Sequence, residues 1–299
     1  MRLALATCSN LPDWEIDDLP FHQAIVDAGI DMERPIWDDP EVDWKRFDAI
    51  LIRTTWDYQE KQLAFNQWAR RVSAFTRLVN PVDVVVWNTA KTYLRDLELV
   101  GAPLTPTQWL DKGSEVDLAV MMKRLGWERG FLKPVVGATA RETLPFDLDE
   151  EGIAKAQAHL ARLLPNESMM LQPFLASVLK EGEYSAIFFG GEFSHGVQKI
   201  PVPGDYRVQD DFGASDKPHI FNEADFETVK RIEKSLLRLV DERFNGVALT
   251  YARVDMIRDA QGQLRLNELE LVEPSLFFRH DAGSPKRLVD ILKREFEKN

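Results

Sequence analysis

Short apolar runs and stretches of helical spacing alternate along the first eighty residues of the chain. The apolar runs predict buried strands at 3–7, 47–52 and 78–80, and the helical spacing predicts helices at 19–28 and 62–75. This alternation indicates an open α/β lobe with a mostly parallel sheet. Ligands bind beyond the carboxyl ends of strands in such sheets, so the loops after Thr7, Ile52 and Asn80 are candidate edges of a site.

The pattern changes from Trp87 onwards, where strands and helices no longer alternate strictly. Helices are predicted at 91–100, 149–164 and 225–244, and strands at 131–134, 169–175, 185–189, 193–199, 247–257 and 264–272. We therefore expect an α/β protein of three parts. An N-terminal parallel α/β lobe covers residues 1–86, and two α+β lobes follow, a central one over 87–175 and a C-terminal one over 176–299.

Composition narrows the classes of function. The 299 residues carry 37 Lys+Arg against 49 Asp+Glu, a net charge of −12, which argues against nucleic acid or an anionic membrane surface as a partner. A small anionic ligand held by a few local cations is still compatible with this charge. The one cysteine, Cys8, excludes a disulfide framework and a thiolate zinc site. No apolar run has the length of a signal sequence or a membrane span, so we expect a cytoplasmic protein.

The strongest chemical pattern lies in the last predicted hairpin. Strand alternation places Glu268 and Glu270 on one face, and antiparallel pairing could set Asp255 beside Glu268. Three carboxylates on one face repel one another unless a cation lies between them, and oxygen ligands favour Mg²⁺ or Mn²⁺. The alternative is an exposed acidic face neutralised by Arg253 or Arg265. A glycosidase pair is excluded, because two acids on one strand cannot flank a sugar from opposite sides.

Candidate phosphate-binding residues lie elsewhere in the chain. The sequence has no G-x-x-x-x-G-K-[ST] and no G-x-G-x-x-G motif, so P-loop and dinucleotide-binding folds lose their main support. Lys133 ends a short apolar strand just before Gly137, and a lysine buried there is costly without an anion. Lys91 opens a predicted helix, and Arg207 lies in a loop beside aromatic residues. For each lysine taken alone, exposure to solvent is the simpler explanation.

In sequence order these pieces resemble the ATP-grasp superfamily, in its glutathione-synthetase-like branch. The matching pieces are Lys91, Lys133 with the small-residue loop 137–141, QPFL at 172–175, Gly182-Glu183, Lys199, Arg207, Asp255 and ELE at 268–270. They cover the chain from about residue 87, and the N-terminal lobe is compatible with them. Fuller strings, RTTWDY at 53–58 and GDYRVQ at 204–209 among them, resemble a narrower bacterial family that includes the D-cycloserine-forming O-ureido-D-serine cyclo-ligase.

The resemblance implies a fold in which the two α+β lobes clasp ATP, and it implies a role for each matching residue. Residues assigned to ATP are Lys91 and Lys133 at the phosphates, the covering loop of Gly137, Ala138, Thr139 and Arg141, Gln172, Phe174 and Leu175 at adenine, and Glu183 at the ribose. Asp255, Glu268 and Glu270 would hold two Mg²⁺ ions, with Mn²⁺ as an alternative. Arg207 would stabilise the transferred phosphoryl group with help from Lys199, and Arg253 would either clamp the substrate carboxylate or pair with the adjacent acids.

Two residues depart from the pattern of the superfamily. The phosphate loop has one glycine, Gly137, where related enzymes have several, so its closure could be stiffer or could use Thr139 and Arg141. Glu270 stands where many relatives have asparagine. The additional negative charge of the glutamate would strengthen cation binding.

The implied activity is ATP- and Mg²⁺-dependent activation of an amino-acid-like carboxylate as an acyl phosphate, which a nitrogen nucleophile then attacks. The substrate is expected between the lobes, near Thr54, Trp56, Asp57, Glu273 and Ser275. Trp56 could equally be a packing residue, and Asp57 could bind a substrate amine. Ring closure within one substrate and joining of two substrates both remain open, as does a homo-oligomer. The rivals from other classes are a non-catalytic ATP/Mg²⁺-binding module and a carbohydrate-binding protein, the latter resting only on eight tryptophans.

Overall fold

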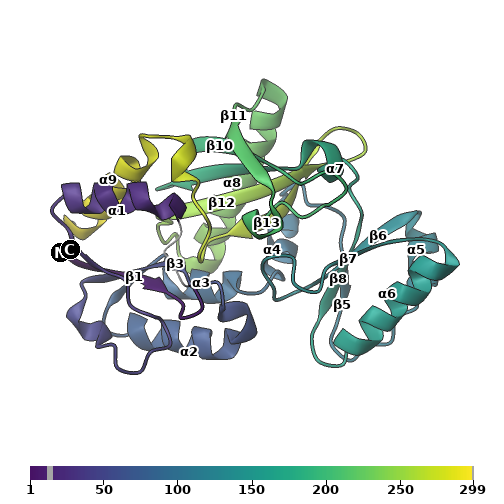
Figure 1. Ribbon diagram of the computed structural model, residues 1–299, viewed down its shortest axis with the longest axis horizontal. Coiled ribbons are helices and arrows are strands. Elements are labelled where there is room, and N and C mark those ends of the chain that lie inside the picture. Colours follow the sequence, from purple (N-terminus) through teal and green to yellow (C-terminus); the bar gives the residue numbers. More distant parts are fainter. Residues whose placement is uncertain (12–15, 298–299) are drawn as a thin grey trace.

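The computed structural model describes residues 1–11 and 16–297, which form three sheets with helices packed on their faces (Figure 1). The N-terminal sheet has the order β2-β1-β3-β4 and is parallel throughout, which confirms the parallel lobe. Its strands are β1 (Arg2–Thr7), β2 (Asp31–Glu33), β3 (Ala49–Thr54) and β4 (Arg77–Val79), and its helices are α1 (Leu19–Asp27), α2 (Gln62–Ser73) and the short turns η1 (Ile16–Asp18), η2 (Trp44–Arg46) and η3 (Tyr58–Glu60). Every residue of β3 is buried, because the chain covers both faces of this sheet.

The central sheet is antiparallel and carries two helices on one face (Figure 1). It consists of β5 (Gln108–Leu110), β6 (Arg129–Pro134), β7 (Leu144–Asp147) and β8 (Met169–Pro173), with α5 (Leu118–Leu125) and α6 (Glu150–Leu163). The Asp149 carboxylate caps α6 by accepting from the Gly152 amide at 2.7 Å. Residues from Leu110 to Leu171 form a hydrophobic cluster of their own under these helices.

The C-terminal sheet is also antiparallel, with the order β11-β10-β9-β12-β13. It comprises β9 (Glu183–Phe189), β10 (Glu192–Ile200), β11 (Ser215–His219), β12 (Tyr251–Arg258) and β13 (Leu264–Glu270), accompanied by α7 (Val178–Glu181), η4 (Asp210–Phe212), α8 (Glu223–Phe244), η5 (Phe278–His280) and α9 (Ser284–Glu297). The buried side of α8 packs on this sheet through Val229, Ile232 and Leu236.

The three predicted parts each contain one sheet, but three helices pack in the core of a part other than their own. Helices α3 (Val82–Asn88) and α4 (Tyr93–Leu99) place Val84, Tyr93 and Leu97 in the core of the C-terminal sheet. Helix α9 returns to pack against α1, and one hydrophobic cluster contains both Phe21 and Leu288. The N-terminal and C-terminal lobes therefore share a core. In residues 1–11 and 16–297, no helix is long and apolar enough to span a membrane.

Candidate functional site

The closing hairpin places three acids on one side of the C-terminal sheet. Asp255 on β12 lies opposite Glu268 on β13, as predicted, and Arg253 lies opposite Glu270. The register then shifts, because Met256 pairs with Leu266 and leaves Asn267 as an extra residue in β13. This bulge lets Asn267 line the same cavity as Glu268.

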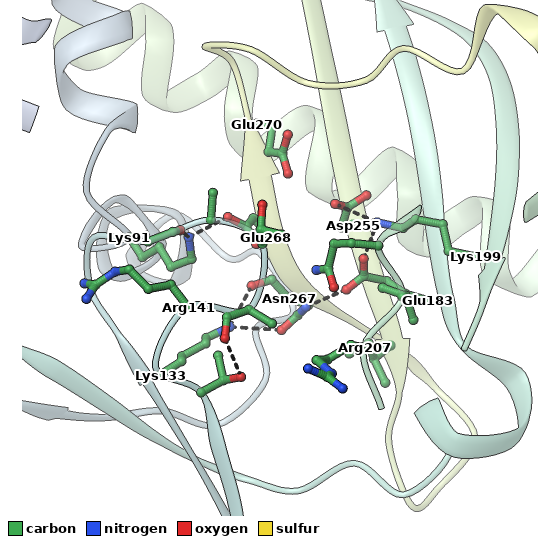
Figure 2. A pocket seen from close by; sticks show the side chains of 18 of the residues that line it. Lys91, Lys133, Arg141, Glu183, Lys199, Arg207, Asp255, Asn267, Glu268 and Glu270 are labelled. Carbon is green, nitrogen blue, oxygen red and sulfur yellow. Dashed lines mark hydrogen bonds and ion pairs between the residues drawn. The ribbon is translucent and has the colours of Figure 1, made fainter. Parts of the chain in front are cut away.

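A cavity of about 310 Å³ lies over this hairpin, and residues of all three lobes line it (Figure 2). Its lining includes the predicted residues Trp56, Lys91, Lys133, Gly137, Ala138, Thr139, Arg141, Gln172, Phe174, Leu175, Glu183, Lys199, Arg207, Arg253, Asp255, Glu268, Glu270, Glu273 and Ser275. The fold thus gathers residues separated by more than two hundred positions in the sequence into one site.

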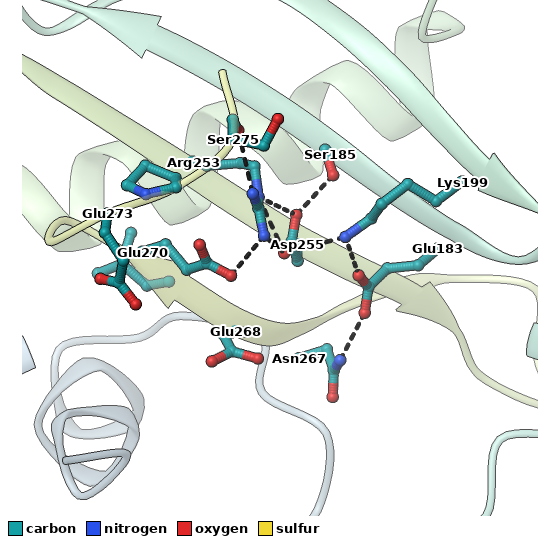
Figure 3. A network of polar contacts seen from close by, with 12 residues as sticks. Glu183, Ser185, Lys199, Arg253, Asp255, Asn267, Glu268, Glu270, Glu273 and Ser275 are labelled. Atoms are coloured by element: carbon teal, nitrogen blue, oxygen red, sulfur yellow. Dashed lines mark hydrogen bonds and ion pairs between the residues drawn. The ribbon is translucent and has the colours of Figure 1, made fainter. Parts of the chain in front are cut away.

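Each of the three acids has a basic partner, and Figure 3 shows the partners of Asp255 and Glu270. Asp255 pairs with Arg253 at 2.9 Å and with Lys199 at 3.2 Å, Glu268 pairs with Lys91 at 2.6 Å, and Glu270 pairs with Arg253. Burial alone would raise the pKa of Asp255, but Arg253 and Lys199 outweigh it and lower the pKa to about 2. Of the two roles expected for Arg253, a clamp on the substrate carboxylate or a partner of the adjacent acids, the structure shows the second.

The same acids fit a magnesium–nucleotide site better than a preformed metal cage. Among the residues that the structure describes, no group of three or more His, Cys, Asp and Glu side chains is arranged to hold a metal ion. Mg²⁺ bound with a nucleotide needs only one or two carboxylates, because phosphate oxygens and water complete its shell. Burial raises the pKa of Glu270 to about 7 although Arg253 opposes this, so its carboxylate is short of compensating positive charge.

Lys133 is the clearest candidate for an anion-binding group. Its side chain is buried, and its ammonium donates to Asn267 Oδ1 at 3.1 Å and to the Asn267 carbonyl at 3.5 Å. Burial lowers the pKa of Lys133 to about 8, although the charge of Glu268 opposes this. The Asn267 amide in turn donates to Glu183 at 2.6 Å, and Glu183 also pairs with Lys199. A buried ammonium whose hydrogen-bond partners are neutral oxygens is suited to receive a phosphate.

Two predicted cations are engaged away from the acids. Arg141 pairs with Glu167 at 2.5 Å and donates to the Val136 carbonyl, and Figure 2 shows its guanidinium pointing away from the acids of β12 and β13. Arg207 pairs with Asp205 at 2.6 Å and lies 3.9 Å from the centre of the Phe212 ring. Arg141 therefore fastens its loop, and Arg207 is held at the rim of the cavity.

An aromatic wall forms the opposite end of the cavity. Phe131 and Phe174 approach within 6.2 Å between ring centres, and Tyr206 packs edge-on against Phe131 at 5.4 Å. The Gln172 amide donates to Thr107 Oγ1 at 2.8 Å, which fixes the strand behind this wall. These inclined rings make an aromatic surface on which a planar ring can stack or pack edge-on.

Between the N-terminal and C-terminal lobes, Trp56 donates to the Glu273 carbonyl at 3.2 Å, and Ser275 Oγ donates to Asp17 at 2.9 Å. Burial, and then the charge of Glu270, raises the pKa of Glu273 well above its usual range. Of the three loops predicted as site edges, the one after β3 supplies lining residues, Trp56 and Tyr58.

Two predicted substrate residues lie outside this lining. The Thr54 hydroxyl pairs with that of Thr7 at 2.7 Å inside the N-terminal sheet. Asp57 accepts from the Trp37 indole at 2.8 Å and pairs with Lys61 at 3.0 Å, so its buried carboxylate is used within the lobe. Sequence reasoning could not separate these residues from Trp56, because β3 ends at Thr54 and side-chain directions beyond it depend on the loop conformation. It also missed Asn267, whose only signal is its position directly before Glu268.

The three lobes and the cavity that they enclose have the fold of the ATP-grasp ligases. Two solved structures have the same fold: the D-alanine–D-alanine ligase of Bacillus anthracis with ATP (TM-score 0.69, 13% identity, covering 100% of this chain and 98% of that one) and the ATP-grasp ligase PsnB with minimal precursor, Mg and ADP (TM-score 0.63, 14% identity, 99% and 98%). The fold expected from the sequence is confirmed.

The particular family is that of the D-cycloserine synthetase DcsG, and this chain belongs to it. It is 33% identical over 283 residues, 92% of each chain, to the cycloserine biosynthesis protein DcsG of Streptomyces lavendulae. Residues 3–80 match the family model of the D-cycloserine synthetase DcsG N-terminal domain. The crystal structure of D-cycloserine synthetase DcsG superimposes with a TM-score of 0.86 at 30% identity, covering 99% of this chain and 100% of that one. The chain is therefore an ATP-dependent ligase, and the narrower resemblance is confirmed.

Proposed function

We propose that the protein closes the ring of O-ureido-D-serine to form D-cycloserine, with ATP and Mg²⁺. The observation that carries this proposal is the 33% identity to DcsG over 92% of both chains, combined with a cavity that all three lobes line. The geometry supports ligase chemistry directly, and the likeness to DcsG supplies the substrate.

The nucleotide would lie with its base against the aromatic wall and its phosphates near Lys91 and Lys133. The backbone of Phe174 and Leu175 at the end of β8 would bind adenine beside Gln172, and Glu183 would accept from the ribose hydroxyls. The buried ammonium of Lys133 supports this orientation, because it is the cation in greatest need of an anion. Gly137, Ala138 and Thr139 would cover the phosphates with Arg141 fastening their loop.

Asp255, Glu268 and Glu270 would hold two Mg²⁺ ions, with Mn²⁺ as an alternative. When bound, the metal supplies positive charge that neutralises the phosphates and the developing charge on the transferred group. Arg253 and Lys199 lower the pKa of Asp255 and so keep this carboxylate ionised before the nucleotide arrives.

The reaction needs positioning and charge rather than a protein nucleophile. A substrate carboxylate oxygen bonds to the γ-phosphorus as the bond to ADP breaks, and a nitrogen then bonds to the carbonyl carbon as phosphate leaves. Arg207 would stabilise the transferred phosphoryl group with help from Lys199, and Arg253 would hold the acids Asp255 and Glu270 in place. Trp56, Glu273 and Ser275 are the substrate residues that the cavity retains from the sequence prediction. Thr54 and Asp57 are bonded within the N-terminal lobe and take no part in this proposal.

The test is turnover of the purified protein with ATP, Mg²⁺ and O-ureido-D-serine, with ADP and D-cycloserine measured together. Ring closure predicts both products without any added amine. Absence of both ADP and D-cycloserine would refute the proposed substrate. ADP release only after adding a second amino acid would instead support an intermolecular ligase of the glutathione-synthetase type, and ATP binding without turnover on any substrate of a panel would support a non-catalytic module.

A homo-oligomer is compatible with this proposal. The solution mass of the purified protein tests it.

A further inference from the structure

One peptide group of the phosphate loop is held at both of its polar atoms by side chains from outside the loop. The Lys91 ammonium donates to the Gly137 carbonyl at 2.6 Å, and the Ala138 amide donates to Gln59 Oε1. Gln59 comes from η3 in the N-terminal lobe, and Lys91 directly precedes α4, which packs in the core of the C-terminal sheet. Three separate parts of the chain therefore meet at the peptide bond between Gly137 and Ala138.

The backbone that follows this peptide needs such support. Thr139, Ala140 and Glu142 have φ values of 48°, 52° and 53°, in the left-handed region that residues with a Cβ rarely adopt. Within the loop, two turn hydrogen bonds hold this shape, from Arg141 N to Ala138 O at 3.0 Å and from Thr143 N to Ala140 O at 3.2 Å. A loop with one glycine cannot rely on glycine for these angles, so contacts from outside stabilise its shape.

Gln59 also lies next to the substrate end of the site. It is half-buried and is absent from the cavity lining, so it touches the site only through other residues. Its amide donates to the Trp56 carbonyl at 3.5 Å, and the Trp56 indole donates to the Glu273 carbonyl at 3.2 Å. The loop after β3 thus contacts both the expected substrate position and the phosphate loop.

We propose that Gln59 is a positioning residue for ATP, which holds the phosphate loop over the cavity through the Ala138 amide before the nucleotide binds. This inference rests on the proposed function in one respect, the placing of ATP phosphates beneath residues 137–141. A loop held in this way loses little conformational freedom when ATP arrives, so the contact strengthens ATP binding. Its contribution falls on nucleotide affinity and leaves the chemical step largely unchanged.

The test compares Gln59→Met, which keeps the length of the side chain and removes the acceptor, with Gln59→Glu, which keeps an acceptor. Gln62→Met is the matched control: Gln62 belongs to the same lobe and donates to the Thr89 carbonyl at 3.2 Å, with no contact to the phosphate loop. Hydrogen exchange at the Ala138 amide in the nucleotide-free protein, MgATP affinity by calorimetry, and the separate KM and kcat values are measured for each.

Gln59→Met is expected to lose protection of the Ala138 amide and to bind MgATP about three- to tenfold more weakly, the loss typical of one hydrogen bond. KM for ATP should rise by a similar factor while kcat stays within about twofold, because the contact acts on binding rather than on the chemical step. Gln59→Glu should retain the amide protection, and Gln62→Met should match the wild type in every readout.

Wild-type protection and affinity in Gln59→Met would overturn the inference, as would an equal loss of affinity in Gln62→Met. Gln59→Leu serves as a second variant without an acceptor if Gln59→Met does not fold. A wild-type protein that binds no MgATP would refute the proposed function instead, and the exchange of the Ala138 amide would still decide whether Gln59 holds the loop.

Discussion

The affinity of the protein for MgATP is expected to fall as the pH rises through 8, because of Lys133. Burial lowers the pKa of this ammonium from the ordinary 10.5 to about 8. That difference corresponds to a free-energy cost of about 3 kcal/mol for protonating Lys133 when no phosphate is bound, relative to a lysine in water. A phosphate beside Lys133 offsets this cost, since the charge attraction acts in a buried and poorly solvated position.

The size and sign of the effect follow from proton linkage. The protonated fraction of Lys133 falls from roughly nine-tenths at pH 7 to roughly one-tenth at pH 9. Because bound phosphate raises the pKa of this lysine, the dissociation constant of MgATP should rise by up to about tenfold per pH unit above 8. The unfolded chain keeps this proton up to about pH 10.5, so Lys133 contributes the opposite trend to the nucleotide-free protein. Its contribution to folding stability increases between pH 8 and 10.5.

The assay is calorimetric titration of MgATP at pH 7, 8 and 9, at constant ionic strength and saturating Mg²⁺. Lys133→Arg is the control, because a guanidinium stays charged throughout this range and should remove the pH dependence even if it binds less tightly. A wild-type dissociation constant that is flat from pH 7 to 9, or an equal slope in Lys133→Arg, would refute the reasoning.

Three further changes give defined outcomes. Glu268→Gln should abolish turnover while MgATP binding persists, and turnover near the wild-type rate would contradict the metal assignment. Asp18→Asn removes the charged partner of the fully buried Arg53 guanidinium, so the free energy of unfolding measured in denaturant should fall by about 3–5 kcal/mol; a fall below about 1 kcal/mol would contradict it. Gly182→Ala would bring a Cβ within 1.8 Å of a carbonyl of β10 and should cost both stability and activity. Gly191→Ala, at a similar φ with nothing within 4 Å, shows the backbone cost alone and should stay active.

Hydrophobic periodicity and strand alternation in the sequence predicted the longer strands and helices and the pairing within the closing hairpin. The pairing of Asp255 with Glu268 follows from strand alternation and a tight connection, and both are visible in the sequence. Short strands such as β5 and β7 were missed, because three or four residues give too little periodicity to recognise. Helix α9 was missed although it is amphipathic, and its position against α1 depends on the folded N-terminal lobe.

The candidate site could be predicted as a set of residues but not as a set of contacts. The resemblance to the ATP-grasp superfamily indicated which residues form the site. All of the predicted site residues except Thr54 and Asp57 line one cavity. The pairing of Arg207 with Asp205 and the contact of Gln59 with Ala138 depend on loop conformations. The bulge that turns Asn267 toward Lys133 depends on a one-residue change of register, which spacing alone does not reveal.

Helix α9 packs against α1, and this contact joins the N-terminal and C-terminal lobes but does not involve the central lobe. The N-terminal and C-terminal lobes share one apolar core, whereas most of the core of the central lobe is built from its own residues. The N-terminal and C-terminal lobes therefore form one continuous body, and the central lobe joins it through Leu104, Val135 and Met170, which pack in the core of the C-terminal sheet. On heating, the central lobe should therefore unfold in a transition of its own, because most of its core is formed by its own residues.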